Sequence, residues 1–266
     1  MLRKRIIFSL IYSEGYFTQS RNFRLQRVGD INWLERNYKF KKIAFSLDEL
    51  IIINATKGAK SMTEFAKTVE RVVCDAFIPI CAGGGIRSMD DAELMFRSGA
   101  DKIILNSILK TDRGLVENLI SKYGSQSIVA SIDYKKSGNL NEVYTGDGKE
   151  KIDQELFSYI EYIQSLDIGE IYLNSIDQDG TGFGYDFEVI RSLEGVLTKP
   201  LIIAGGAGNE KHLIEGLMID EVSAVATANL FNFIGDGIPN ARKKVLEANL
   251  NIVNWDSANL NLNKEL

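Results

Sequence analysis

Apolar runs of strand type alternate with helical patterns along most of the chain. Helical spacing is seen where Met62, Phe65, Val69 and Val73 recur at intervals of three and four residues. Short apolar runs between such segments predict strands over residues 5–10, 49–54, 77–83, 102–106, 127–133, 170–175, 200–205 and 224–228. This alternation predicts a parallel sheet covered by helices. The number of units and the length of 266 residues predict an α/β fold, a closed (β/α)8 TIM barrel, as a single domain over residues 1–266.

Two glycine-rich turns divide the chain into similar halves. Ala82-Gly83-Gly84-Gly85-Ile86 and Ala204-Gly205-Gly206-Ala207-Gly208 each follow a predicted strand and precede a helical pattern. They are 122 residues apart, close to half of the chain, which predicts a two-fold half-barrel repeat. The same displacement relates Ile11 to Asp133, so a carboxylate is kept at only one of two equivalent positions.

An open doubly wound sheet is the main alternative architecture. Its dinucleotide fingerprint requires a G-x-G-x-x-G spacing after the first strand, whereas only Gly15 follows Leu10 there. Residues 137–149 carry glycines and charges, and we expect a surface hairpin or a mobile loop. The tail over residues 249–266 has few apolar residues and is expected to pack loosely.

Composition excludes several classes of function. A net charge of −5 and a pI near 5.2 disfavour nucleic-acid binding. No apolar run approaches the roughly 20 residues that span a bilayer, and no signal peptide is expected. Cys74 and Cys81 are interpreted as small buried thiols of a reducing cytoplasm. A single histidine, His212, excludes a histidine triad and a multi-histidine metal site, and we expect no metal and no cofactor.

In barrels of this type the site lies at the carboxyl ends of the strands. Glycine turns there let backbone N–H groups approach an anion, next to the start of a helix. We therefore predict two phosphate-binding groups at the mouth. The first is Gly84, Gly85, Asn106 and Ser107, and the second is Gly205, Gly206, Ala228 and Asn229. The alternative is that these are tight turns without a ligand.

The segment Ser175-Ile176-Asp177-Gln178-Asp179-Gly180-Thr181 follows the sixth predicted strand. Two acids and a turn glycine at a barrel mouth suit a polar substrate. We include Asp179 and Gly180 among the candidate phosphate-binding residues. The alternative is an aspartate-rich turn that hydrogen-bonds its own backbone.

Several short motifs, spread from residue 1 to about residue 233, form a specific set. They are Met1-Leu2, Lys4-Arg5-Ile6-Ile7, Asp48-Glu49-Leu50, Gly83-Gly84-Gly85-Ile86, Gly99-Ala100-Asp101-Lys102, Gly124-Ser125-Gln126, Ser175-Ile176-Asp177, Asp179-Gly180-Thr181 and Gly205-Gly206-Ala207-Gly208. With them the chain resembles the HisF family, the cyclase subunits of imidazole glycerol phosphate synthase. The resemblance implies a glutaminase partner at the amino-terminal face of the barrel and ammonia passing through the barrel to the mouth. There, members of that family cleave and cyclise a bis-phosphorylated ribonucleotide.

The resemblance also implies a pair of aspartates as general acid and base at the ends of strands 1 and 5. The strand 5 position is Asp133, but the strand 1 position is Ile11, whose hydrocarbon side chain cannot transfer a proton. Two further family positions have changed, an aspartate to Asn54 and a lysine to Gln19. Glu14 lies close in sequence to the missing carboxylate, but we expect no compensation from it.

Two bases and two acids at strand starts match the ring that guards the lower end of the barrel in the family. They are Arg5, Glu49, Lys102 and Glu170, and the set is neutral as a whole. The resemblance implies an ammonia gate below an apolar bore. The alternative is an ion-pair plug that only seals the barrel floor and stabilises it.

A HisF-like barrel without the strand 1 carboxylate resembles paralogues associated with surface-polysaccharide genes. The resemblance implies a HisH-like glutaminase partner and an N-acetyl sugar amidotransferase that receives the ammonia and builds an acetamidino sugar. It also implies a phosphorylated small-molecule ligand in the mouth. We expect a subunit of a glutamine amidotransferase complex, in the cytoplasm, in lipopolysaccharide biosynthesis, without nucleic-acid or membrane partners.

Three alternatives remain open at this point. In the first alternative, the chain is a histidine-pathway cyclase, a lyase, with altered acid–base chemistry, and Asp133 acts alone or with Glu14 or Tyr12. It is a non-catalytic activator of a glutaminase, which a bulky residue in the bore, for instance at Ala130 if that residue faces inward, would distinguish. Or it is a sugar-phosphate isomerase on a related barrel, against which Ile11 also counts.

Overall fold

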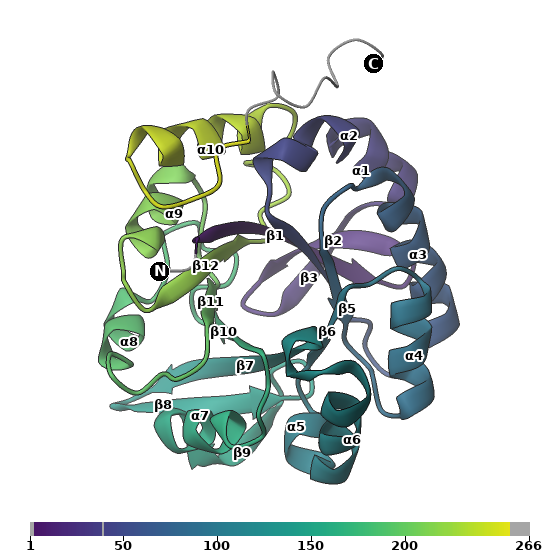
Figure 1. Ribbon diagram of the computed structural model, residues 1–266, viewed down its shortest axis with the longest axis vertical. Coiled ribbons are helices and arrows are strands. Elements are labelled where there is room, and N and C mark those ends of the chain that lie inside the picture. The colour runs from purple at the N-terminus through teal and green to yellow at the C-terminus, as the bar shows by residue number, and fades with distance from the viewer. Residues whose placement is uncertain (1–2, 39, 256–266) are drawn as a thin grey trace.

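Eight parallel strands close into a barrel in the computed structural model, which describes residues 3–38 and 40–255 (Figure 1). Each strand pairs in parallel with the next, and β10 pairs with β7 to close the ring. The barrel strands are β1 (Arg5–Ser13), β4 (Glu49–Asn54), β5 (Ile80–Gly83), β6 (Lys102–Leu105), β7 (Ile128–Ser137), β10 (Glu170–Ser175), β11 (Leu201–Ala204) and β12 (Val222–Thr227). The predicted (β/α)8 fold is confirmed.

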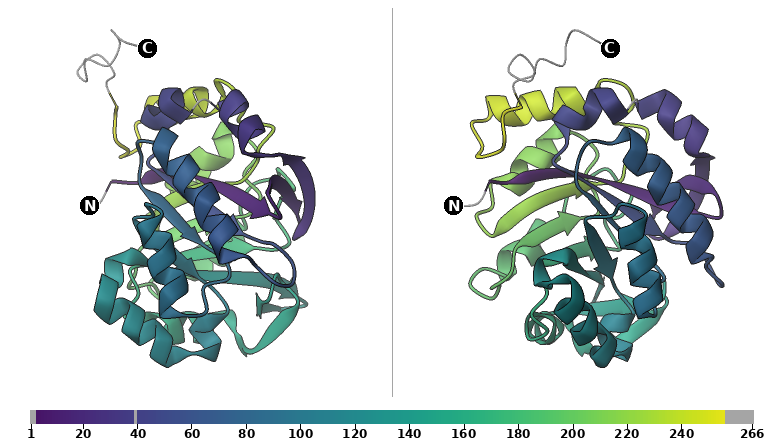
Figure 2. Two further views of the ribbon diagram at one scale, coloured as in Figure 1. Left: turned by 90° about the vertical axis from the view of Figure 1, so that its right-hand side faces the viewer. Right: turned by 45° about the vertical axis from the view of Figure 1, so that its right-hand side comes forward.

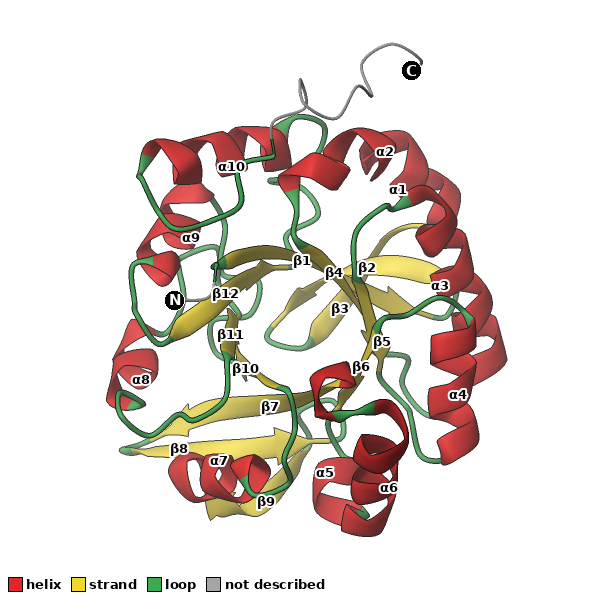
Figure 3. Ribbon diagram, in the orientation of Figure 1, coloured by secondary structure: helices red, strands yellow, loops and turns green. Residues whose placement is uncertain are grey.

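Helices surround the barrel on its outside (Figure 3). They are α1 (Ile31–Tyr38), α2 (Phe40–Ile43), α3 (Met62–Asp75), α4 (Met89–Arg97), α5 (Ile108–Thr111), α6 (Arg113–Tyr123), α7 (Leu156–Gln164), α8 (Phe187–Ser192), α9 (Glu210–Leu217) and α10 (Gly237–Glu247), with 3-10 turns at Ala44–Ser46 and Ser125–Ser127. Helix α4 begins as its sequence predicts, because the Ser88 side chain accepts a hydrogen bond from the Asp91 N–H. Gly99 follows the helix with φ of 92°, a conformation that favours glycine.

The strand predicted over residues 77–83 begins only at Ile80. Pro79 precedes it and has no N–H to donate to a neighbouring strand. Phe77 lies in the loop before the strand with 76% of its surface exposed. The apolar run there is therefore longer than the strand.

The core has two parts, because successive side chains of a strand point to opposite sides of the barrel wall. The larger cluster lies between the strands and the helices. The smaller cluster fills the barrel interior with Ile7, Ile51, Cys81, Ile104, Val129, Tyr172, Ile202, Ala204, Ala224 and Ala226. Ala130 belongs to the larger cluster and faces the helices, so it cannot serve as a site for blocking the bore.

Two antiparallel hairpins extend from the barrel at the carboxyl ends of its strands. β2 (Tyr16–Arg21) and β3 (Arg24–Gly29) follow β1, and β8 (Leu140–Thr145) and β9 (Glu150–Glu155) follow β7. Figure 2 shows the β2–β3 hairpin on the side away from the N-terminus. The hairpin predicted near residues 137–149 is present, whereas the β2–β3 hairpin was not expected from the sequence.

A buried ion pair joins the amino-terminal face of the barrel to the last helix. Asp48 accepts hydrogen bonds from both terminal nitrogens of Arg242, at 2.9 and 3.0 Å. Ile252 beyond α10 is buried and bridges to Lys4, so this part of the tail packs more firmly than expected. The rest of the tail, residues 256–266, lies outside the described residues.

Two further expectations concern the two cysteines and membrane-spanning helices. Cys81 is buried in the bore as expected, but Cys74 near the end of α3 is exposed, because it lies on the outer face of that helix. Among the described residues, none of the helices is both long enough and apolar enough to cross a bilayer.

Candidate functional site

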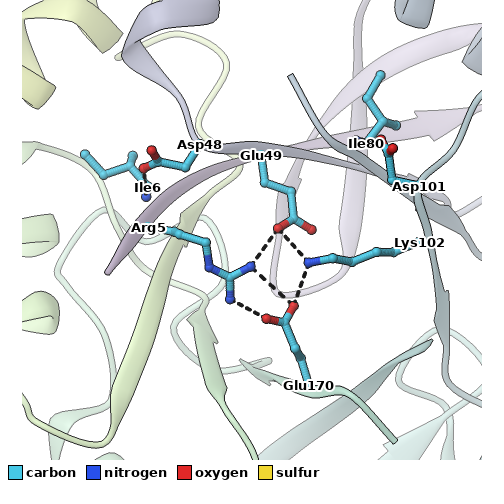
Figure 4. A network of polar contacts seen from close by, with 8 residues as sticks. All are labelled: Arg5, Ile6, Asp48, Glu49, Ile80, Asp101, Lys102 and Glu170. Atoms are coloured by element: carbon cyan, nitrogen blue, oxygen red, sulfur yellow. Dashed lines mark hydrogen bonds and ion pairs between the residues drawn. The ribbon is translucent and has the colours of Figure 1, made fainter. Parts of the chain in front are cut away.

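A ring of four charged side chains closes the amino-terminal end of the bore (Figure 4). Each residue stands at the start of a strand, so the closed barrel brings all four together. Arg5 contacts Glu49 at 2.8 Å and Glu170 at 2.5 Å, and Lys102 contacts the same two carboxylates at 3.0 Å each. The four residues predicted as an ammonia gate therefore form one alternating ring of acids and bases.

Burial and charge act in opposite directions on the acids of this ring. Burial raises the pKa of Glu49, although Lys102 and Arg5 oppose that rise. For Glu170, whose side chain is less buried, the two cations outweigh burial and hold the pKa below its usual value. Glu49 Oε1 is buried and accepts no hydrogen bond from the described residues. The ring thus carries a free acceptor atom although its charges are paired.

A cavity of about 740 Å³ occupies the other end of the barrel, at the carboxyl ends of the strands. Every residue predicted from the sequence as catalytic or phosphate-binding lines it. These are Gly84, Gly85, Asn106, Ser107, Asp133, Asp179, Gly180, Gly205, Gly206, Ala228 and Asn229, and the cavity is also lined by Ile11, which replaces the second expected aspartate. The barrel therefore gathers the sequence candidates into one mouth, opposite the charged ring.

The first glycine turn has a lysine beside it. Gly84 and Gly85 have φ of 90° and 112°, so this path favours glycine. A Cβ on Gly85 would come within 2.8 Å of the Lys60 side chain. Lys60 Nζ donates to the Asn54 carbonyl at 2.7 Å and lies 3.8 Å from Asp147 on the β8–β9 hairpin. An anion at this turn would meet backbone N–H groups and a nearby cation.

The second glycine turn is built by close backbone packing. A Cβ on Gly206 would lie 1.9 Å from the Gly184 carbonyl oxygen, and one on Gly205 would lie 2.5 Å from the Ser175 carbonyl oxygen. Asn209 caps α9 behind the turn by accepting hydrogen bonds from the N–H groups of Lys211 and His212. These glycines are thus required by the fold whether or not a ligand binds.

Asp133 is the ionisable centre of the mouth. Burial raises its pKa from 3.8 to about 7, and hydrogen bonds from Asn174 and Asn106 oppose that rise. Asn174 donates to Oδ1 and Asn106 donates to Oδ2, each at 3.1 Å. A carboxyl group with a pKa near neutrality can both give and take a proton. The Asn106 amide, predicted to bind phosphate, here positions Asp133.

Within residues 3–38 and 40–255, no second carboxylate takes the place that Ile11 fills. Glu14 forms an ion pair with Arg27 at 2.5 Å and lines a separate cavity of about 260 Å³ beside Tyr12. Its backbone has φ of 50° in the turn after β1, and the ion pair holds its side chain against β3 of the hairpin. Ile11 itself lies between its β4 neighbour Ile53 and the hairpin. Asp133 and Glu14 therefore do not face one another.

Asp179 and Gly180 hold the β2–β3 hairpin over the mouth. The Asp179 carboxylate accepts hydrogen bonds from Ser20 Oγ at 2.5 Å and from the Phe23 N–H at 3.0 Å. A Cβ on Gly180 would lie 2.0 Å from the Ser20 carbonyl oxygen. Both residues line the cavity, but the Asp179 side chain is engaged by the hairpin. Its predicted contact with phosphate would have to come from the backbone.

Among the cavity residues that the sequence analysis missed, three matter for the chemistry of the site. Lys60 and Asn174 follow or end strands β4 and β10, so their place at the carboxyl ends was a usable signal. Tyr172 forms part of the cavity floor from inside β10. The alternation of side chains along β10 could have placed Tyr172 on the same inner face as Glu170. It could not have shown how far the aromatic side chain of Tyr172 extends into the bore.

Comparison with known proteins shows the family to which the chain belongs. A family model described as histidine biosynthesis protein matches residues 26–235. A provisionally named imidazole glycerol phosphate synthase subunit hisF2 of Parasynechococcus marenigrum is 43% identical over 244 residues, which cover 92% of this chain and 91% of that protein. The imidazole glycerol phosphate synthase subunit HisF of Chlorobium phaeobacteroides (strain BS1) is 35% identical over 95% of this chain and 99% of its own length. That of Dehalococcoides mccartyi (strain BAV1) is 36% identical over 88% and 91%. The chain belongs to the histidine biosynthesis protein family, as a HisF-like imidazole glycerol phosphate synthase subunit.

Proposed function

We propose that this chain is the barrel subunit of a glutamine amidotransferase complex that passes ammonia from a HisH-like glutaminase to an amidation reaction. We place that reaction in the synthesis of an acetamidino sugar of a surface polysaccharide. In this proposal a separate sugar amidotransferase consumes the ammonia, and a phosphorylated ligand binds in the mouth.

One observation carries the proposal: the charged ring is complete while the acid–base pair is not. All four positions of the charged ring carry the acid or base that the family resemblance implies, and their ion pairs are 2.5 to 3.0 Å long. At the mouth, Asp133 accepts hydrogen bonds from two asparagines, and Ile11 lines the same cavity at the position where the resemblance implies the second acid. Cyclisation with a single proton carrier loses the paired acid and base on which such chemistry depends. Moving a neutral base through the bore requires no such pair.

The first test is ammonia-dependent cyclisation. The bis-phosphorylated ribonucleotide of the histidine pathway is supplied with ammonium salt, and formation of the imidazole product is followed. We expect no turnover above background, with the HisF subunit of Chlorobium phaeobacteroides as the positive control. Turnover comparable to that control would overturn the proposal.

Ile11→Asp is the companion variant, with Ile11→Asn as its matched control. Both introduce a polar group of similar size, but only the aspartate can transfer a proton. A gain of cyclisation by Ile11→Asp and not by Ile11→Asn would show that the missing carboxylate is what limits the parent chain. Equal activity of the two variants would mean that proton transfer at this position is not the limit.

The second test separates a conduit from a simple activator. Ala226 lies in the inner cluster of the bore, so Ala226→Phe narrows the path. In the assembled complex, we expect glutamine hydrolysis to continue while glutamine-driven amidation falls and ammonium-driven amidation is unchanged. If glutamine-driven amidation is unaffected in a folded Ala226→Phe variant, the barrel acts only as an activator. Thermal unfolding of the variant checks that the barrel is intact.

A cyclase with altered chemistry is the second candidate function, and the raised pKa of Asp133 is the observation that favours it. A pKa of about 7 suits one group that serves in turn as acid and base. The cyclisation assay above decides between the two candidates.

A further inference from the structure

A tyrosine side chain crosses the bore above the charged ring. Tyr172 lies on β10, two residues after Glu170, and its side chain belongs to the inner cluster. Its hydroxyl lies 3.2 Å from Ser9 Oγ on β1. Both residues are buried, with 4% and 1% of their surfaces exposed. This bond joins the same two strands as the Arg5–Glu170 ion pair, one step farther along the barrel.

Tyr172 separates the mouth from the lower bore. From above it lines the mouth cavity together with Ile11 and Ile53. On the other side is Cys81, which is fully buried and pairs in register with the ring residue Lys102. Burial raises the pKa of the Cys81 thiol, and the charge that adds most to this effect is that of Glu49. The thiol thus faces the bore beside a strand of the ring, and it is not among the residues that line the mouth cavity as Tyr172 does.

The hydroxyl pair is a weak closure compared with the ring. A neutral hydrogen bond contributes only about 1 kcal/mol net, whereas bonds to charged groups are stronger. Among the residues that the structure describes, neither hydroxyl has another hydrogen-bond partner. Separating the two would therefore leave both unsatisfied in an apolar bore, unless the molecule that enters both donates and accepts hydrogen bonds. Ammonia does both, and it is small and neutral.

We propose that Tyr172 and Ser9 form a second closure of the bore, which ammonia crosses by replacing the hydrogen bond between the two hydroxyls. The passage of ammonia rests on the proposed function, but the closure itself does not. Two closures in series, one charged and one neutral, separate the partner face of the barrel from the ligand in the mouth. Tyr172 touches the cavity, so it is the side chain through which a ligand there can bias the closure.

Cys81 provides a reporter of the closure that needs neither glutaminase nor ligand. In a Cys74→Ser background, which removes the exposed thiol, the protein is treated with methyl methanethiosulfonate, a small neutral thiol reagent. The rate of labelling of Cys81 is followed by intact mass. We compare the parent with Tyr172→Phe, Ser9→Ala, the double variant and Tyr172→Leu. Tyr159→Phe is the matched control, because Tyr159 is an equally buried tyrosine in the outer cluster.

Loss of the hydrogen bond should raise the labelling rate about fivefold in Tyr172→Phe and in Ser9→Ala, which corresponds to about 1 kcal/mol. Because both variants remove the same bond, the double variant should be no faster than either single one. In Tyr172→Leu the labelling rate should rise more than tenfold, because the aromatic side chain itself is removed. Tyr159→Phe should leave the rate at the parental value.

Unchanged labelling in Ser9→Ala and Tyr172→Phe overturns the closure, as does a double variant whose effect is the product of the two single ones. A rise of the same size in Tyr159→Phe would also overturn it, because labelling would then report general loosening of the barrel. Ser9→Ala keeps the tyrosine ring in place, so it tests the closure even if Tyr172→Leu fails to fold.

The ammonia step has its own measurement in the glutaminase complex. Tyr172→Phe should change the fraction of glutamine nitrogen that reaches the acceptor while glutamine hydrolysis stays at the parental rate. An unchanged fraction, in a variant whose Cys81 labelling has risen, overturns ammonia passage at this point and leaves the closure standing. If no nitrogen reaches the acceptor even in the parent complex, the proposed function itself fails, independently of the closure.

Discussion

Asn174 and Asp133 are register partners on neighbouring strands, and the Asn174 amide donates to Asp133 Oδ1 at 3.1 Å. Together with the equal contact from Asn106, this places an acid between two neutral donors in a partly buried position at the mouth. Neither amide supplies the positive charge that would keep the carboxyl ionised. Burial therefore dominates, and Asp133 has a pKa of about 7.

The first prediction is a pH-dependent stability difference for Asp133→Asn. The pKa of Asp133 rises from 3.8 in the unfolded chain to about 7 on folding, so the folded state binds the proton more tightly. The stabilisation from that proton is present below about pH 4 and is lost as pH rises through 7. Urea unfolding should show the free energy of unfolding of the variant, relative to the parent, rising by about 3 kcal/mol between pH 5 and pH 8. If the difference in free energy of unfolding between variant and parent does not change with pH, the raised pKa of Asp133 is contradicted.

The second prediction concerns the ring at the other end of the bore. Lys102→Met leaves the buried carboxylate of Glu49 and the largely buried carboxylate of Glu170 with Arg5 as their only partner in the ring. We expect a loss of about 2 kcal/mol in the free energy of unfolding, below the usual cost for a fully buried pair because Lys102 is 20% exposed. Lys122→Met, which breaks an exposed pair with Glu93, is the control and should cost less than about 0.5 kcal/mol. Equal costs would mean that the ring contributes no more than a surface ion pair.

The third prediction tests the attachment of the β2–β3 hairpin. Gly180→Ala adds backbone strain at φ of 69° and a Cβ 2.0 Å from the Ser20 carbonyl oxygen. Gly138→Ala is the matched control, because φ is 60° there and nothing lies within 4 Å. Strain alone costs about 1 kcal/mol in each variant, so Gly180→Ala should lose at least about 1 kcal/mol more. Amide hydrogen exchange over residues 16–29 should speed up only in Gly180→Ala, and equal exchange would refute the contact.

The fourth prediction addresses the first glycine turn as an anion site. Gly85→Ala forces a residue with a Cβ into φ of 112° and toward Lys60. We expect the affinity for inorganic phosphate or a sugar phosphate to fall at least about tenfold, because the N–H groups of the turn lose their alignment. Gly195→Ala, at φ of 74° in a distant loop with nothing within 4 Å, should leave the affinity unchanged. Calorimetric titration measures both, and equal affinities would exclude this turn as the phosphate site.

Several features of the fold were predictable because they depend on local patterns. The alternation of strands and helices, the two glycine turns and the Ser88 cap each rest on residues close together in sequence. The family positions at strand starts and strand ends could be placed on the two faces of the barrel for the same reason. The β2–β3 hairpin was missed because its turn residues Asn22 and Phe23 carry no glycine, although both have positive φ.

Other features depend on residues far apart in the chain. Cys74 is exposed because its side of α3 faces away from the barrel, and Ala130 faces the helices because the register of β7 turns its neighbours inward. The roles of Asp179 and Glu14 were set by where the hairpin docks. The sequence position of a carboxylate does not show which hydrogen-bond donor or cation it contacts in the folded protein.

The sequence by itself determined the barrel, its repeat, the glycine turns and the substitution of Ile11 for an acid, because these are properties of residue type and spacing. Tertiary structure decided which groups meet inside the barrel. It closed four distant charges into a ring, turned Glu14 away from Asp133 and brought Tyr172 to Ser9 across the bore. The ring contacts and the Tyr172–Ser9 bond join strands more than 40 residues apart. Their geometry depends on barrel closure and register, which no local pattern encodes.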